Sequence, residues 1–107
     1  MNLITINQDQ NNKILKVKID DLITIRLKEN PSTGYRWKFG ELDKKIIEIE
    51  GSEYIHPSNK GIGSGGMRTF TFRAKSLGKT KVQLQLKREW EKDKDPFDQF
   101  TLFIHII

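Results

Sequence analysis

The 107-residue chain contains no Cys, which excludes disulfides, thiolate metal sites and a cysteine nucleophile. Its composition, 36% hydrophobic and 31% charged with a net charge of +5, is typical of a soluble globular protein, and its length suits one domain, residues 1–107. No apolar run approaches the ~20 residues of a membrane span, and the first residues lack the basic start and apolar block of a signal peptide, so we expect a monomeric, cytoplasmic protein with no membrane partner.

Apolar and polar residues alternate along most of the chain, and this period of two predicts β-strands. The expected strands are 3–6, 14–19, 22–27, 35–39, 46–50 and 52–55 on either side of Gly51, 68–74, 80–86 and 100–107. Seven or eight short strands with frequent turns are typical of an all-β, immunoglobulin-like antiparallel β-sandwich. Trp37 lies in the middle of a strand with apolar neighbours on the same face, so we expect it in the core.

Three connections contain unusual residues, and these are loops 28–35, 56–67 and 87–98. In a sandwich built from successive hairpins, alternate connections lie at the same end, as the recognition loops of immunoglobulin variable domains do. We therefore expect the three loops to cluster.

The first loop contains Asn30-Pro31-Ser32-Thr33-Gly34-Tyr35. Pro31 fixes its own φ angle and favours an extended conformation at Asn30. Gly34 can adopt a positive φ or allow another chain to approach its backbone. The pattern predicts a stiff turn with hydroxyl groups at its tip, which is either an ordinary hairpin loop or a rigid probe for another protein's cleft.

The second loop contains Gly63-Ser64-Gly65-Gly66 followed by Met67. A phosphate-binding loop is not expected, because no Gly-Lys-Ser/Thr ending follows and the next element is a strand. The segment is either a flexible hairpin loop or a binding edge with exposed backbone amides. Met67 is either a core residue or an adaptable contact.

Trp90 in the third loop lies among charged residues, from Lys87 to Lys94. A Trp in this setting either folds back over the sheet edge or stands exposed as a binding anchor. Trp and Arg are the commonest interface hot spots, which makes Arg88 and Trp90 candidate contacts.

The positive charge is concentrated in residues 61–86, which contain five Lys or Arg residues and no Asp or Glu. These five are Arg68, Arg73, Lys75, Lys79 and Lys81. Such a segment either meets nucleic acid or an acidic protein surface, or forms a solvated strand face.

The sequence offers no set of residues for catalysis. His56 and His105 are far apart and lack an evident nucleophile or carboxylate partner, and no metal-ligand spacing is present. We therefore expect neither an enzyme nor a cofactor or metal site.

Taken together, the three loops resemble those of the chagasin-like inhibitors of papain-family cysteine peptidases. Asn30–Tyr35 is similar to the family's Asn-Pro-Thr/Ser-Thr-Gly-aromatic motif, residues 63–66 to its Gly-x-Gly-Gly loop, and Arg88-Glu89-Trp90 to its Arg-Pro-Trp motif. The likeness spans nearly the whole chain. Glu89 stands where the family usually has Pro, which puts the rigidity of the third loop in doubt.

The resemblance implies a reversible, competitive inhibitor whose three loops fill the peptidase cleft. Thr33 and its neighbours would approach the catalytic Cys–His pair, the loop from Gly63 to Met67 would line one side of the cleft, and Trp90, with Arg88, would contact the other. No nucleic-acid partner is expected. The alternative is a non-inhibitory immunoglobulin-like module that binds a protein or, weakly, nucleic acid through the basic segment 61–86.

Overall fold

The structure, a computed structural model, describes residues 2–40, 42–56, 65–90 and 95–107. In these ranges it contains eight strands, two 3-10 helices of three residues each and no α-helix. The elements are β1 (Leu3–Asn7), η1 (Gln8–Gln10), β2 (Ile14–Val17), β3 (Leu22–Glu29), η2 (Pro31–Thr33), β4 (Tyr35–Phe39), β5 (Ile47–Ile55), β6 (Gly66–Ala74), β7 (Gly78–Arg88) and β8 (Asp98–Ile106). Within the described ranges, neither helix is long and apolar enough to cross a membrane. The expected all-β fold of seven to eight strands is confirmed.

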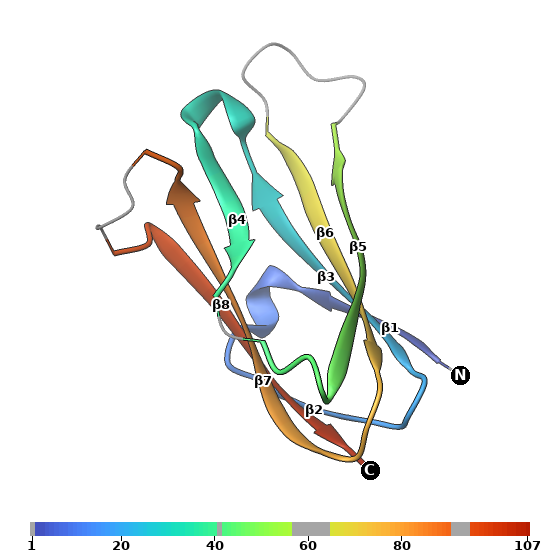
Figure 1. The fold of residues 1–107 in the computed structure, drawn as a ribbon. Helices are drawn as coiled ribbons and strands as arrows, with labels where there is room; N and C mark the ends of the chain where they lie inside the picture. The colour runs from blue at the N-terminus through green and yellow to red at the C-terminus, as the bar shows by residue number, and fades with distance from the viewer. Residues whose placement is uncertain (1, 41, 57–64, 91–94) are drawn as a thin grey trace.

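The strands form two four-stranded sheets that pack face to face (Figure 1). The first sheet has the order β1–β3–β6–β5 and the second has the order β2–β8–β7–β4. Four pairings are antiparallel, as expected, but β1 runs parallel to β3 and β2 runs parallel to β8. The chain changes sheets between β1 and β2, so each of these short strands adds to the edge of a sheet and forms no hairpin with the strand that follows it in sequence.

The core lies between the two sheets and contains every second residue of the central strands, as the period of two predicts. Its fully buried side chains are Ile23, Ile25, Leu27, Ile47, Phe72, Val82, Leu84, Phe100, Leu102, Ile104 and Ile106. Trp37 is also buried, with 4% of its surface exposed, which confirms its expected place in the core.

Some strand boundaries differ from the expected ones. β2 ends at Val17 and Ile19 is 44% exposed, because the chain turns at Asp20, whose φ angle is +75°. β5 continues through Gly51, where a bulge shifts its register against β6. A bulge of this kind lets one strand absorb an extra residue without ending the pairing.

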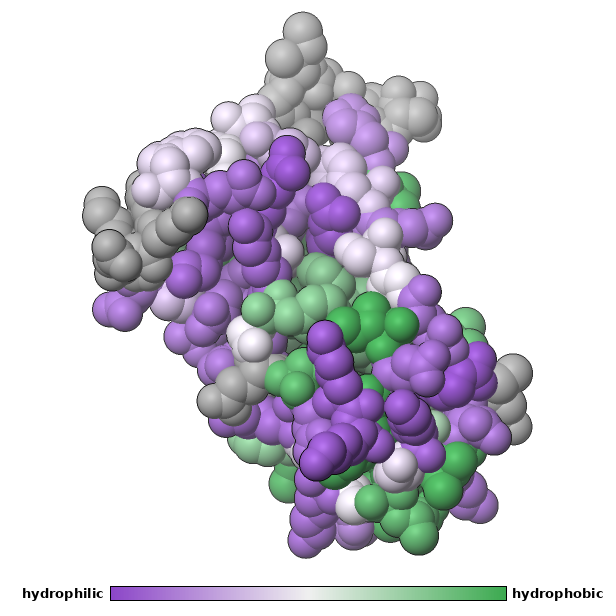
Figure 2. Space-filling model, viewed as in Figure 1, coloured by the Kyte–Doolittle hydropathy of each residue, from purple (hydrophilic) through white to green (hydrophobic). Residues whose placement is uncertain are grey.

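One long side of the sandwich shows β4 and β5, which are the edge strands of the two sheets. Hydrophobic side chains gather near the centre of this side, and hydrophilic side chains surround them (Figure 2). Phe39 at the end of β4, and Leu42 and Ile46 in the segment that follows it, are partly buried and pack against the core. The segment that joins β4 to β5 therefore helps to close the gap between the sheets.

Candidate functional site

At one end of the sandwich β3, β5 and β7 end and β4, β6 and β8 begin, so the described ends of three connections lie there (Figure 1). Contacts join the first connection to each of the other two. Arg88 Nε donates a hydrogen bond of 3.1 Å to the carbonyl oxygen of Thr33. Gly65 lies against Glu29 and Asn30 closely enough that a Cβ on it would be 3.3 Å from the Glu29 carbonyl oxygen. The structure thus brings together described residues from all three predicted loops.

The first connection is the 3-10 helix η2, and hydrogen bonds within the loop hold it. The Asn30 side chain accepts from the Ser32 backbone N–H at 3.1 Å and from the Ser32 hydroxyl at 2.7 Å. Thr33 Oγ1 donates to the Asn30 carbonyl oxygen at 2.7 Å. Pro31 occupies the first helical turn, where its missing N–H costs little. Both hydroxyls therefore bond back to Asn30 and stiffen the tip.

Gly34 ends this short helix in the left-handed conformation, with φ +82°. Its N–H donates to the carbonyl oxygen of Pro31 at 3.0 Å. The ring of Trp90 lies directly against it, so that a Cβ on Gly34 would be 2.5 Å from Trp90 Cη2. The conformation and the close approach both require glycine at this position.

Arg88, the last residue of β7, connects the first and third loops. Its guanidinium carbon lies 4.2 Å from the centre of the Tyr35 ring and 5.7 Å from the Trp90 ring. Both distances are within the range of a cation–π attraction. Arg88 thus contacts the tip through Thr33, β4 through Tyr35, and the ring of Trp90.

Two large apolar side chains on the third connection remain open to solvent. Trp90 is 69% exposed and Phe97 is 71% exposed. The ring of Phe97 lies 4.8 Å from that of Tyr35, and its N–H donates to the Leu86 carbonyl oxygen at 2.9 Å. Trp90 therefore does not fold over the sheet edge; it stands exposed, with its ring supported from below by Gly34.

Glu89 forms an ion pair of 3.3 Å with Lys38 on β4. Both side chains are about half exposed or more, so the pair adds little stability. Tyr35 touches both Arg88 and Phe97, so the first connection contacts described residues on both sides of the third.

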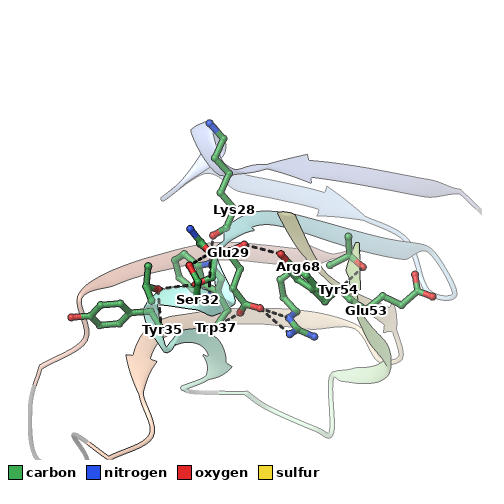
Figure 3. Close-up of polar contacts among 11 residues, drawn as sticks. Lys28, Glu29, Ser32, Tyr35, Trp37, Glu53, Tyr54 and Arg68 are labelled. Atoms are coloured by element: carbon green, nitrogen blue, oxygen red, sulfur yellow. Dashed lines mark hydrogen bonds and ion pairs between the residues drawn. The ribbon is translucent and has the colours of Figure 1, made fainter. Parts of the chain in front are cut away.

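Beneath the tip lies a buried carboxylate, that of Glu29 (Figure 3). One oxygen accepts from the Trp37 backbone N–H at 2.7 Å, and the other accepts from Arg68 Nε at 3.1 Å and Nη2 at 2.8 Å. Trp37 Nε1 donates to the Lys28 carbonyl oxygen at 2.8 Å. Because β3 and β6 belong to one sheet and β4 to the other, Glu29 joins the two sheets directly below the loops.

Of the second predicted loop, Gly63 and Ser64 lie outside the described residues. Gly66 begins β6 and is buried, and a Cβ there would collide with the Ile55 carbonyl oxygen and the Tyr54 hydroxyl. This close packing of β6 on β5 accounts for glycine at that position. Met67 is half-buried, beside a shallow surface pocket of about 340 Å³ that Lys28 and Ile55 also line.

The basic segment 61–86 does not form one surface. Arg68 pairs with Glu29 and Arg73 pairs with Glu50, both on the first sheet, whereas Lys79 and Lys81 belong to β7 in the second sheet. A nucleic-acid surface built from this segment alone is therefore not supported.

Among the described residues, no group of three or more His, Asp and Glu side chains could hold a metal ion.

Comparison with known proteins adds to this geometry. The family model described as "Chagasin family peptidase inhibitor I42" matches residues 16–104, which is most of the chain. The chain belongs to the chagasin family of peptidase inhibitors. It is 30% identical over 107 residues to amoebiasin-2 of Entamoeba histolytica, covering 94% of this chain and 83% of that one. It is 28% identical over 104 residues to chagasin of Trypanosoma cruzi, covering 92% and 94% of the two chains.

Two solved structures share the fold of this chain. The crystal structure of the cysteine protease inhibitor EhICP2 from Entamoeba histolytica has a TM-score of 0.88 with 25% identity, covering 100% of this chain and 97% of that one. PbICP-C, solved in complex with falcipain-2, has a TM-score of 0.60 over 99% and 88% of the two chains, and at 16% identity this likeness concerns the fold alone.

Sequence reasoning missed three residues that build the site, namely Glu29, Arg68 and Phe97. A glutamate that follows Leu27 at the inward-facing spacing of β3 is a signal that could have identified Glu29, because a charge in the core requires a partner. Phe97 follows Pro96 in a charged segment and gives no comparable signal. Arg68 was counted with the basic segment, although its side chain pairs within the first sheet.

Proposed function

We propose that this chain inhibits papain-type cysteine peptidases reversibly, by inserting the end of the sandwich formed by its three loops into the active-site cleft. The observation that carries the proposal is the set of contacts that joins the first and third loops through Arg88, Gly34 and Trp90. Loops that are ordered before binding lose little conformational entropy on binding, so more of the contact energy contributes to affinity.

The η2 tip is the part proposed to reach the catalytic groups. It is narrow, and the hydroxyls of Ser32 and Thr33 bond back to Asn30. Its 3-10 turn is not the extended conformation that a peptidase substrate adopts along a cleft. The tip would therefore occupy the cleft without offering a peptide bond for cleavage, which makes inhibition competitive.

The flanks of the tip would contact the cleft walls. Trp90 and Phe97 offer exposed apolar surface on the side of β7 and β8. On the other side, the exposed Gly65 and the half-buried Met67 lie on either side of the buried Gly66, close to the exposed Ile55. Exposed aromatic side chains of this kind are enriched at protein–protein interfaces.

The test is an inhibition assay with a purified papain-type peptidase and a peptide substrate. Wild-type protein should inhibit at micromolar concentration or below, with Ki independent of the order of mixing. Trp90→Ala should raise Ki roughly thirtyfold, since an exposed interface Trp contributes about 2 kcal/mol. Absence of inhibition by micromolar wild-type protein would contradict the proposal.

A matched control is Leu77→Ala, which removes an equally exposed apolar side chain (65%) from the turn between β6 and β7, at the opposite end. This variant should leave Ki unchanged. An equal rise in Ki for Leu77→Ala and Trp90→Ala would contradict the proposal that the end of the sandwich with the three loops binds the peptidase. Thermal unfolding of both variants checks that each is folded.

We also infer a cytoplasmic location, which the Cys-free sequence supports. It remains a prediction.

A further inference from the structure

The outer faces of the two sheets differ in charge. On the second sheet, the outward positions of β2, β4, β7 and β8 contain no Asp or Glu and six cationic residues. These six are Lys16, Arg36, Lys38, Lys79, Lys81 and Lys87. On the first sheet, Arg73 faces Glu48 in register and pairs with Glu50, so positive and negative side chains are mixed. The excess positive charge is therefore concentrated on one outer face.

Two of these cations lie next to the loop end. Arg36 is directly opposite Lys87 in the pairing of β4 with β7, one residue from Tyr35 and Arg88 respectively. Within the described ranges, no ion pair joins either side chain to a carboxylate, whereas the neighbouring Lys38 pairs with Glu89. Like charges directly opposite each other destabilise a pair of strands, so the fold itself gives no reason for this pairing.

We propose that the outer face of the second sheet at its loop end, marked by Arg36 and Lys87, recruits peptidases with an acidic surface beside the active-site cleft. The inference rests on the proposed function, because it concerns the peptidase that the loops enter. Complementary charge at the rim of an interface speeds association and changes dissociation little. The partner is thus a papain-type peptidase with negative charge on the side of the cleft that meets Trp90.

The two ends of this face allow the inference to be separated from a general effect of net charge. Lys79 precedes Lys87 by eight residues on the same strand, which corresponds to roughly 26 Å at about 3.3 Å per residue. This separation exceeds the Debye length, which is about 8 Å at physiological ionic strength and about 14 Å at about 0.05 M. Lys16 also lies at the far end, since it pairs with His105, which in turn pairs with Lys79.

The experiment compares two double variants that remove the same charge. Arg36→Gln/Lys87→Gln changes the loop end, and Lys16→Gln/Lys79→Gln changes the far end. Stopped-flow association is measured with two purified papain-type peptidases, one net negative and one net positive at the assay pH. The low-salt condition is an ionic strength of about 0.05 M, at which the two ends of the face are still screened from each other, and the second condition is physiological salt.

With the negative peptidase at low salt, we expect the loop-end variant to associate roughly fivefold more slowly than wild type. Its dissociation rate should change less than twofold, and the difference from wild type should shrink as salt is raised. With the positive peptidase, the same variant should associate as fast as wild type or faster. The far-end variant should stay within about twofold of wild type throughout.

Equal slowing by the two variants would overturn the inference, because it would reduce the effect to net charge. Unchanged association of the loop-end variant with the negative peptidase would also overturn it, even where wild-type protein inhibits normally. The proposed function is judged separately by the equilibrium Ki of wild-type protein. A wild-type protein that binds neither peptidase would overturn both.

Discussion

Gly34 shows how one residue can determine the geometry of a binding loop. Its positive φ ends η2, and its missing side chain leaves room for the Trp90 ring. A side chain would both strain the backbone and push against the indole. The position of Trp90 therefore depends on a residue more than fifty positions earlier in the chain.

Gly34→Ala should lower the free energy of unfolding by about 1 kcal/mol or more, since Ala disfavours the left-handed conformation. It should also raise Ki at least tenfold, because the added methyl group displaces the ring of Trp90, which is the proposed binding hot spot. Urea unfolding and the inhibition assay measure the two effects.

Gly51→Ala is the control for that substitution. A Cβ on Gly51 meets no atom within 4 Å, and the residue lies in the bulge of β5, away from the loops. Inhibition should be unchanged in this variant. If Gly34→Ala kept full potency, Trp90 would not depend on Gly34 for its position.

At the scale of elements, the ends of β3, β4 and β6 are held together by the Glu29 carboxylate. It accepts three hydrogen bonds, one from β4 and two from Arg68 on β6. Removing one member of a buried ion pair leaves the other uncompensated, which costs far more than losing an exposed pair. The loop end is therefore supported by a polar contact inside an otherwise apolar core.

Glu29→Ala should lower the free energy of unfolding by about 3 kcal/mol, because it leaves Arg68 without its carboxylate and the Trp37 N–H without an acceptor. Glu50→Ala is the matched control, since its pair with Arg73 is one-third exposed on both sides. We expect that variant to lose less than about 1 kcal/mol. If urea unfolding gave similar losses of unfolding free energy for Glu29→Ala and Glu50→Ala, the role assigned to Glu29 would be contradicted.

The sequence predicted which residues form strands better than it predicted which strands pair. Alternating residues identified β3, β6, β7 and β8, whose inward side chains form the core. Alternation does not report which strands pair, so the parallel neighbours of β1 and β2 were not foreseen. The loop motifs located Gly34, Arg88 and Trp90, but their mutual contacts depend on three-dimensional packing that no local pattern contains.

At the scale of the whole molecule, Asp21 ties the N-terminal strands to the sandwich. Its buried carboxylate accepts from the backbone N–H of Lys18 and of Asn2, each at 2.9 Å. These two hydrogen bonds, of which the one from Lys18 has the larger effect, hold the pKa of Asp21 below its ordinary value of 3.8. A lowered pKa in the folded state means that the ionised form stabilises the fold.

This stabilisation should be fully present above the ordinary pKa and be lost as the pH falls below it toward the pKa of the folded state. Wild-type protein should therefore be more stable than Asp21→Asn at pH 7, and the difference should shrink at pH 3. Urea unfolding of both proteins at the two pH values measures it. A difference that does not change with pH would show that the carboxylate charge is not involved.

The Glu29 network has a consequence for engineering. The carboxylate joins β4 to β6 across the two sheets below the tip, and Arg88 on β7 bonds to the tip itself, so the spacing of the loops depends on how the two sheets pack. A graft of the three loop sequences onto another immunoglobulin-like scaffold would lack this support. Glu29, Trp37 and Arg68 would have to be transferred with the loops, together with a sheet packing that lets them meet.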